Sequence, residues 1–75
     1  RNVELYETLT PRERQVFRRV VRGLLNKQIA FELDISEVTV KLHRSSMMKK
    51  MCATSTAHLF GAWQSLPAEL RASDG

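Results

Sequence analysis

Only residues 34–36 separate two segments that both carry the pattern of an amphipathic helix. In the segment before this gap, Ile29, Ala30 and Leu33 face one way. After the gap, side chains at spacings of three and four line one face of a second helix: Val40, His43, Met47 and Met51. Because so short a connection forces the two helices to cross at a steep angle, the pattern predicts a helix-turn-helix.

A helix is also predicted upstream of this pair, over about residues 11–22. Thr10 and Glu13 can form a capping box around Pro11, which presets the first helical φ. An apolar stripe then follows at helical spacing: Val16, Phe17, Val20 and Val21. Gly23 is expected to end this helix in a left-handed conformation.

The other helices are also predicted from their capping residues. Asn26 is the expected cap of a short helix that ends near Asp34. Ser36 is the expected cap of a helix that runs to about residue 51. Ser55 then caps a last helix, which Pro67 stops.

The two ends of the chain carry weaker signals. Residues 1–9 are interpreted as an N-terminal linker, and residues 67–75 as a C-terminal tail of weak helical character that frays. The domain proper is then residues 10–66. Since no repeat and no β pattern is present, the predicted fold class is all-α: a compact four-helix domain containing a helix-turn-helix. The start at Arg1 rather than Met suggests a piece of a longer protein.

Composition narrows the function classes. The chain has 75 residues with a net charge of +4, which indicates one small basic domain. Its three glycines are scattered, so no glycine-rich phosphate loop exists, and an enzyme is the less expected class. The single cysteine and the lack of a secretory signal favour a reducing, cytoplasmic location. No apolar run approaches the roughly 20 residues that cross a bilayer.

The positive charge is concentrated in two stretches. Residues 11–22 carry five arginines against Glu13, and residues 36–52 carry three lysines and one arginine against Glu37. Either stretch could meet phosphate, and either could be an ordinary solvated helix face.

Helix-turn-helix geometry assigns roles within the second stretch. The second helix of such a pair lies in the major groove, and its N-terminal residues reach base edges. Lys41, Leu42 and Ser45 lie on the outward side, where they offer an ammonium for guanine, an apolar surface for the thymine methyl, and a hydroxyl. Phosphate contacts are expected from the start of the first helix of the pair and from the flanks of the second: Asn26, Lys27, Thr39, Arg44 and Lys49.

Five sequence blocks together resemble the LuxR/FixJ-type DNA-binding domain, across about residues 9–63. They are LTPRERQV at 9–16, GL at 23–24, NKQIA at 26–30, LDIS at 33–36 and TVKLHR at 39–44. Within that family, residues 34–36 together with Lys50 and Met51 look most like the C-terminal effector domain of a FixJ-type two-component response regulator, and quorum-sensing relatives are the next choice.

The resemblance implies a domain that binds promoter DNA as a homodimer, with an N-terminal receiver domain outside this chain. It implies the same base-facing residues as above, and adds His43 to those that serve the DNA backbone. Two positions depart from the family pattern. Cys52 stands where many members have glycine, which leaves the end of the helix before it open, and Thr56 stands where arginine is common, which removes one phosphate contact.

The last helix carries more apolar surface than one core face can use. Leu59, Phe60, Ala62 and Trp63 are all apolar, and Gly61 would permit a second helix to approach closely. A homodimer through this helix is therefore predicted, with Leu59, Ala62 and Trp63 as its contact residues.

Other functions are less well supported. His43, His58 and Cys52 lack the paired spacing of a zinc site, so no metal and no cofactor is expected. Ser45 and Ser46 have no base and acid placed to activate them. Two alternatives to a transcription regulator stay open: region four of a sigma factor, which has a similar start, and a helical protein-interaction module that uses the apolar last helix.

Overall fold

The computed structural model describes residues 1–72, and this part of the chain is built from helices without a strand. The helices are α1 Asn2–Glu7, α2 Pro11–Val21, α3 Asn26–Leu33, α4 Glu37–Lys50, α5 Thr56–Gln64 and α6 Ala68–Ala72. The all-α fold class is confirmed, and α2 to α5 are the four predicted helices. The end of the predicted tail, residues 73–75, lies outside the described residues.

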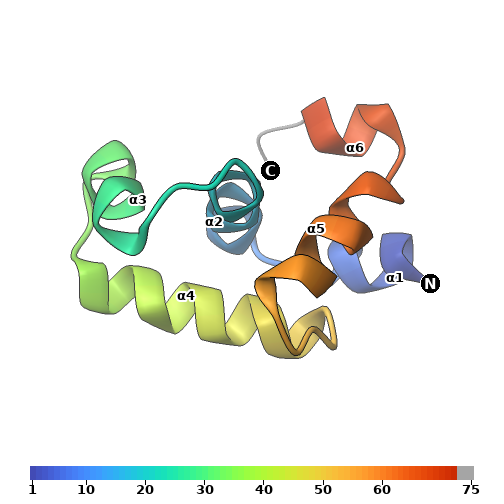
Figure 1. The fold of residues 1–75 in the computed structure, drawn as a ribbon, viewed down its shortest axis with the longest axis horizontal. Coiled ribbons are helices and arrows are strands. Elements are labelled where there is room, and N and C mark those ends of the chain that lie inside the picture. Colours follow the sequence, from blue (N-terminus) through green and yellow to red (C-terminus); the bar gives the residue numbers. More distant parts are fainter. Residues whose placement is uncertain (73–75) are drawn as a thin grey trace.

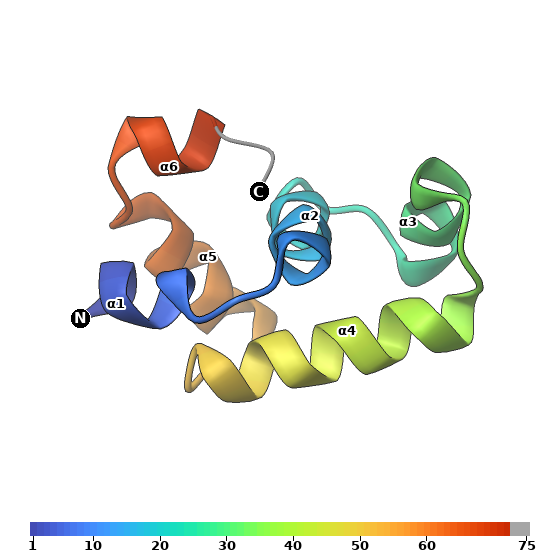
Figure 2. The same ribbon diagram turned by 180° about the vertical axis from the view of Figure 1, so that it is seen from behind.

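Helix α4 is the base on which the other predicted helices rest (Figure 1). α3 lies across its N-terminal end, α2 across its middle, and α5 near its C-terminal end, and the opposite view shows the same order (Figure 2). Side chains from these helices meet in one core: Val16, Phe17, Val20, Ile29, Val40, Met47, Met51 and Leu59. Because this core lies on one side of α4, the opposite side of α4 is left to solvent.

The predicted capping box at the start of α2 is confirmed. The backbone N–H of Thr10 donates to Glu13 Oε1 at 2.9 Å, and the backbone N–H of Glu13 donates to Thr10 Oγ1 at 3.1 Å. After α2 the chain turns through Gly23, whose φ of +89° is easily adopted only by glycine. Local sequence therefore sets both ends of this helix.

The start of α3 differs by one residue from the prediction. Leu25 is the capping position and Asn26 is already helical. The reason is Gln28, whose side-chain Oε1 accepts from the backbone N–H of Leu25 at 2.7 Å and so closes the turn. Asn26 is therefore not needed as the cap, and its side chain accepts a hydrogen bond from Arg44 instead.

The other two predicted caps are confirmed. Ser36 Oγ accepts from the backbone N–H of Thr39, and Ser55 Oγ accepts from that of His58, each at 3.1 Å. These bonds satisfy amides that have no partner within their own helix. The three residues between α3 and α4 contain Asp34, which has a left-handed φ of 55° and turns the chain sharply.

The N-terminal segment is not the linker that the sequence suggested. Residues 2–7 form α1, and Tyr6 is only 1% exposed. The Tyr6 ring lies 5.8 Å from the Phe17 ring and 6.3 Å from the Trp63 ring, between centroids. One aromatic side chain thus anchors the segment to α2 and α5, although six residues are too few to show a clear helical period.

The C-terminal segment also differs from a fraying tail. Helix α5 already ends at Gln64, so Pro67 is not the residue that stops it. Instead, the Pro67 carbonyl accepts from the backbone N–H groups of Leu70 and Arg71. These bonds begin α6, and Leu70 packs half-buried against the core.

Helix α4 ends at Lys50, and Cys52 takes the left-handed φ of 55°. A side chain in this conformation brings Cβ close to the backbone, whereas glycine has no such contact. We therefore expect Cys52→Gly to raise the free energy of unfolding by about 1 kcal/mol, measured by urea denaturation. Cys52→Ala keeps the Cβ and is the matched control. A glycine variant no more stable than the alanine variant would contradict this account of the turn.

Candidate nucleic-acid interface

The outer face of α4 carries the three residues predicted to read bases. Lys41, Leu42 and Ser45 are all exposed, and Leu42 is 66% exposed. On the opposite face of the same helix, Val40 and Met47 are completely buried. The structure thus places an ammonium, an apolar side chain and a hydroxyl together on a solvent-facing surface.

Val38 belongs to this surface and was not among the predicted site residues. It lies one turn before Leu42 and is equally exposed, at 66%. Two branched apolar side chains therefore stand in water on adjacent turns of α4, next to Lys41. At helical spacing Val38 falls opposite the buried stripe, and this was the available signal, although an isolated exposed apolar residue carries little information by itself.

The first turns of α3 and α4 carry further predicted residues. Lys27 is exposed in the first turn of α3. Thr39 is half-buried, and its hydroxyl lies 2.9 Å from that of Ser36. Both positions lie in a first helical turn, where backbone N–H groups without a partner in the helix can attract an anion, although that of Thr39 itself donates to Ser36 Oγ.

Arg44 holds contacts within the protein, although it was predicted to contact phosphate. Its guanidinium donates through Nη1 to Asn26 Oδ1 at 2.9 Å and through Nη2 to Thr56 Oγ1 at 3.3 Å. The side chain is half-buried and connects α4 to the first residues of α3 and α5. Arg44 and Asn26, which were both predicted to contact phosphate, are thus bonded to each other. Arg44 also bonds to Thr56, the position where the family commonly has arginine.

Two lysines near the end of α4 have different surroundings. Lys49 is exposed, as expected of a phosphate contact. Lys50 Nζ instead donates to Glu13 Oε1 at 2.9 Å. His43, between the outer and inner faces, is half-buried.

Glu13 is the one buried charged residue among the described residues, at 3% exposed. Its burial acts to raise the pKa of the carboxyl group. Hydrogen bonds from Ser46, the Thr10 backbone and Lys50, together with the charge of Lys50, outweigh that effect and lower the pKa to about 2. The carboxylate therefore stays ionised and joins the start of α2 to the end of α4.

The basic stretch along α2 is largely occupied by contacts within the domain. The Arg14 guanidinium lies 4.8 Å from the Tyr6 ring centroid, and that of Arg18 lies 5.8 Å from the Trp63 ring centroid. Arg19 Nε lies 2.8 Å from a carboxylate oxygen of Glu32. On α4, Arg44 and Lys50 are engaged in the same way, whereas the ammonium groups of Lys41 and Lys49 are exposed and available to a ligand.

The predicted dimer residues on α5 are mostly inside the domain. Leu59 and Ala62 are 0% and 4% exposed. Trp63 is half-buried, with its ring 5.3 Å from that of Phe17. Because their side chains already fill the core between α2 and α5, Leu59 and Ala62 are not available to a second subunit. The large apolar side chain that α5 does expose is Phe60.

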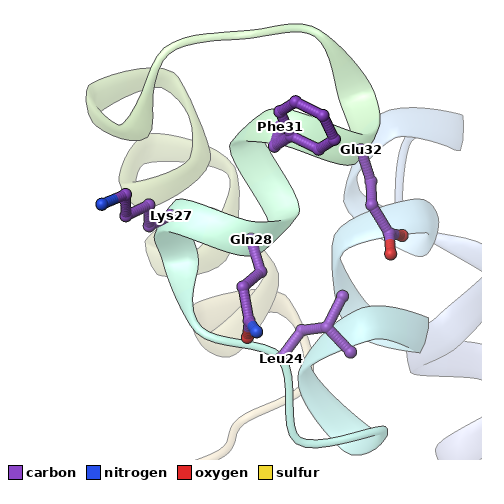
Figure 3. A pocket seen from close by; sticks show the side chains of 5 residues that line it. All are labelled: Leu24, Lys27, Gln28, Phe31 and Glu32. Atoms are coloured by element: carbon purple, nitrogen blue, oxygen red, sulfur yellow. The ribbon is translucent and has the colours of Figure 1, made fainter.

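A shallow groove lies between α3 and the end of α2 (Figure 3). It has a volume of about 490 Å³ and is lined by Leu24, Lys27, Gln28, Phe31 and Glu32. Phe31 is 88% exposed. Sequence reasoning gave this residue no role.

Neither a metal site nor a membrane span is found in residues 1–72. No three or more His, Cys, Asp or Glu side chains of this part gather closely enough to hold a metal ion. None of its helices is long and apolar enough to cross a membrane.

Comparison with known proteins identifies relatives over most of the chain. A model of the family described as "Bacterial regulatory proteins, luxR family" matches residues 7–61. The response regulator protein TmoT of Ectopseudomonas mendocina is 50% identical over 66 residues, which are 88% of this chain and 30% of TmoT. The response regulator protein TodT of Pseudomonas putida strain F1 is 57% identical over 56 residues, 75% of this chain and 25% of TodT.

A solved structure of a response regulator has the same fold. The structure of StyR superposes with a TM-score of 0.85 at 46% identity, and the match covers 87% of this chain and 33% of StyR. The chain therefore spans about a third or less of the length of these relatives.

Proposed function

The chain belongs to the luxR family of bacterial regulatory proteins, whose helix-turn-helix binds DNA, and from this premise we propose that it reads specific promoter sequences through the outer face of α4. Domains of this family also serve as output domains of transcriptional response regulators, and the relatives TmoT and TodT are response regulators. It is not an enzyme family.

The exposed face of α4 is the observation that carries the proposal. Lys41 supplies donors for guanine O6 and N7, and Leu42 supplies an apolar surface for the thymine methyl group. Ser45, one turn after Lys41, can donate or accept. Val38 extends the apolar strip toward the N-terminus of α4, the end of a recognition helix that enters the groove.

Contacts to the sugar-phosphate backbone complete the proposed interface. Lys27 at the start of α3 and Lys49 near the end of α4 are exposed ammonium groups. Asn26 and Thr39 add neutral donors at two helix N-termini, and His43 lies on the flank of α4. Such contacts fix the position of the protein on the duplex without reading its sequence. Arg44, by contrast, is held by Asn26 and Thr56.

We further propose that the domain binds DNA as a homodimer through α5. Phe60 is the large exposed apolar side chain on this helix, and the neighbouring Gly61 is also exposed, so a second helix could approach there. Trp63 remains half-buried and lies at the edge of that surface. The pairing would place two copies of α4 in successive major grooves of one face of the duplex.

The whole protein is proposed to contain a receiver domain beside this one. The named relatives are response regulators that are several times longer than the part matched here. A phosphorylation signal would then reach the DNA-binding domain from a part of the protein outside this chain.

Lys41→Ala tests which face of α4 enters the groove. We expect it to reduce affinity for the preferred duplex by about 1–3 kcal/mol and to relax the preference at one base position, because a bidentate contact is lost. The measurement is a selection from random duplexes by the wild type and the variant, followed by titration of the enriched sequence. The selection also reports whether two half-sites are enriched, as a homodimer requires.

Lys27→Ala is the matched control, since it also removes one exposed lysine. It should weaken binding to all duplexes about equally and lower the salt dependence. An unchanged base preference in Lys41→Ala would overturn the assignment of the reading face. If no duplex is enriched by the wild type, the protein-interaction alternative is favoured instead.

A further inference from the structure

Arg44 is placed where three helices meet, and both of its hydrogen bonds are to side chains at helix starts. Asn26 is the first residue of α3, and Thr56 is the first residue of α5. The guanidinium reaches Asn26 Oδ1 at 2.9 Å and Thr56 Oγ1 at 3.3 Å. A planar group with fixed donor directions is suited to hold two acceptors at once.

The bond to Asn26 determines which way its carboxamide points. A carboxamide has its acceptor oxygen and its NH₂ group on opposite sides. Since Oδ1 faces Arg44, the two N–H donors of Asn26 are directed away from Arg44. Asn26 stands beside the exposed Lys27 in the first turn of α3, where backbone N–H groups are also unpaired within the helix.

The same bonds restrict what Arg44 itself can do. Its side chain is half-buried, and two of its nitrogen atoms already donate within the protein. The guanidinium keeps three further N–H groups, but the side chain cannot swing out toward a phosphate without breaking these two bonds. Lys27 and Lys49, by contrast, are exposed and can reach phosphate without such a loss.

We propose that Arg44 is a positioning residue for DNA binding: it fixes the starts of α3 and α5 against α4 and orients the Asn26 carboxamide so that its N–H groups face a backbone phosphate. This inference rests on the proposed DNA-binding function. It assigns the phosphate contact to Asn26 and makes the contribution of Arg44 indirect.

A double-mutant cycle in the 75-residue chain tests this role. Arg44→Gln, Asn26→Ala and the double variant are titrated with a random-sequence duplex at several salt concentrations, well below the thermal midpoint of each variant. Each single variant should bind about 2- to 10-fold more weakly, the size of one lost hydrogen bond. The double variant should bind no more weakly than Asn26→Ala, because Arg44 acts on the phosphate contact only through Asn26.

Asn26→Asp separates positioning from folding. Aspartate still accepts from Arg44, and with a charge, so the thermal midpoint should not fall. Its second oxygen would face phosphate in place of the NH₂ group, and affinity should fall further than in Asn26→Ala. A residue that only stabilised the fold would not separate affinity from stability in this way.

The salt dependence identifies a direct contact. Lys27→Gln should reduce the slope of log K against log salt by about 0.9, the value for one phosphate. Arg44→Gln should reduce it by less than half as much. An equal reduction, with additive losses in the cycle, would show that Arg44 contacts phosphate itself and would overturn the proposal while leaving DNA binding intact. A wild-type chain that binds no duplex would overturn both.

Discussion

Replacing Tyr6 with alanine is expected to lower the free energy of unfolding by about 3–4 kcal/mol, the cost of removing a large buried aromatic side chain. Tyr6 is 1% exposed and lies against the rings of Phe17 and Trp63. The Arg14 guanidinium also lies over its ring. Truncation would leave a cavity between α1, α2 and α5 that these neighbours cannot fill without moving.

Urea denaturation followed by circular dichroism measures the effect, with Glu7→Ala as the control. Glu7 is on the same helix but exposed, so its replacement should change the free energy of unfolding by less than about 0.5 kcal/mol. If the two variants proved equally stable, α1 would not be part of the core. The expected loss also means that a chain starting at residue 10 would be much less stable than this one.

The free energy of unfolding is expected to fall by about 3 kcal/mol as the pH is lowered from about 5 to 2, because of Glu13 alone. Its pKa is about 2 in the folded domain against an ordinary value of 4.5. Protons therefore bind the unfolded chain before they bind the folded one. The stabilisation is complete above pH 4.5 and is lost as the pH falls toward 2.

Glu13→Gln removes this titration and should flatten the stability profile between pH 5 and 2. Glutamine can still accept from the Thr10 backbone, so the start of α2 is retained. Glu4→Gln is the matched control, since Glu4 is exposed and the charge change is the same. Urea midpoints at several pH values give the profile. A Glu13→Gln profile as steep as that of the wild type would place the acid sensitivity elsewhere.

The helix boundaries were largely predictable because capping is local. Thr10, Ser36 and Ser55 each bond to an amide three residues later, and such short-range bonds are visible in sequence. The exception is α3, where Asn26 looked like the better cap. Gln28 closes that turn from within the helix, and the arginine that engages Asn26 comes from α4.

Local sequence also predicted which residues of the candidate site are exposed, but not which of them have partners within the protein. Periodicity placed Lys41, Leu42 and Ser45 opposite a buried stripe, and the structure leaves them exposed. Periodicity could not show that Arg44 already has partners within the protein. It also could not show that Arg14 and Arg18 are engaged within the domain, because the rings that they contact come from α1 and α5.

The four main helices, the steep turn at residues 34–36 and the outer face of α4 could all be predicted from local sequence, since each follows from side chains within a few turns of one another. That residues 2–7 close the core and that Leu59 and Ala62 face inward became visible only in the folded domain. A helical period shows that a face is apolar, but not which surface covers it. That choice depends on the segments that reach the face through space, and here the side chain of Tyr6 arrives from the opposite end of the chain.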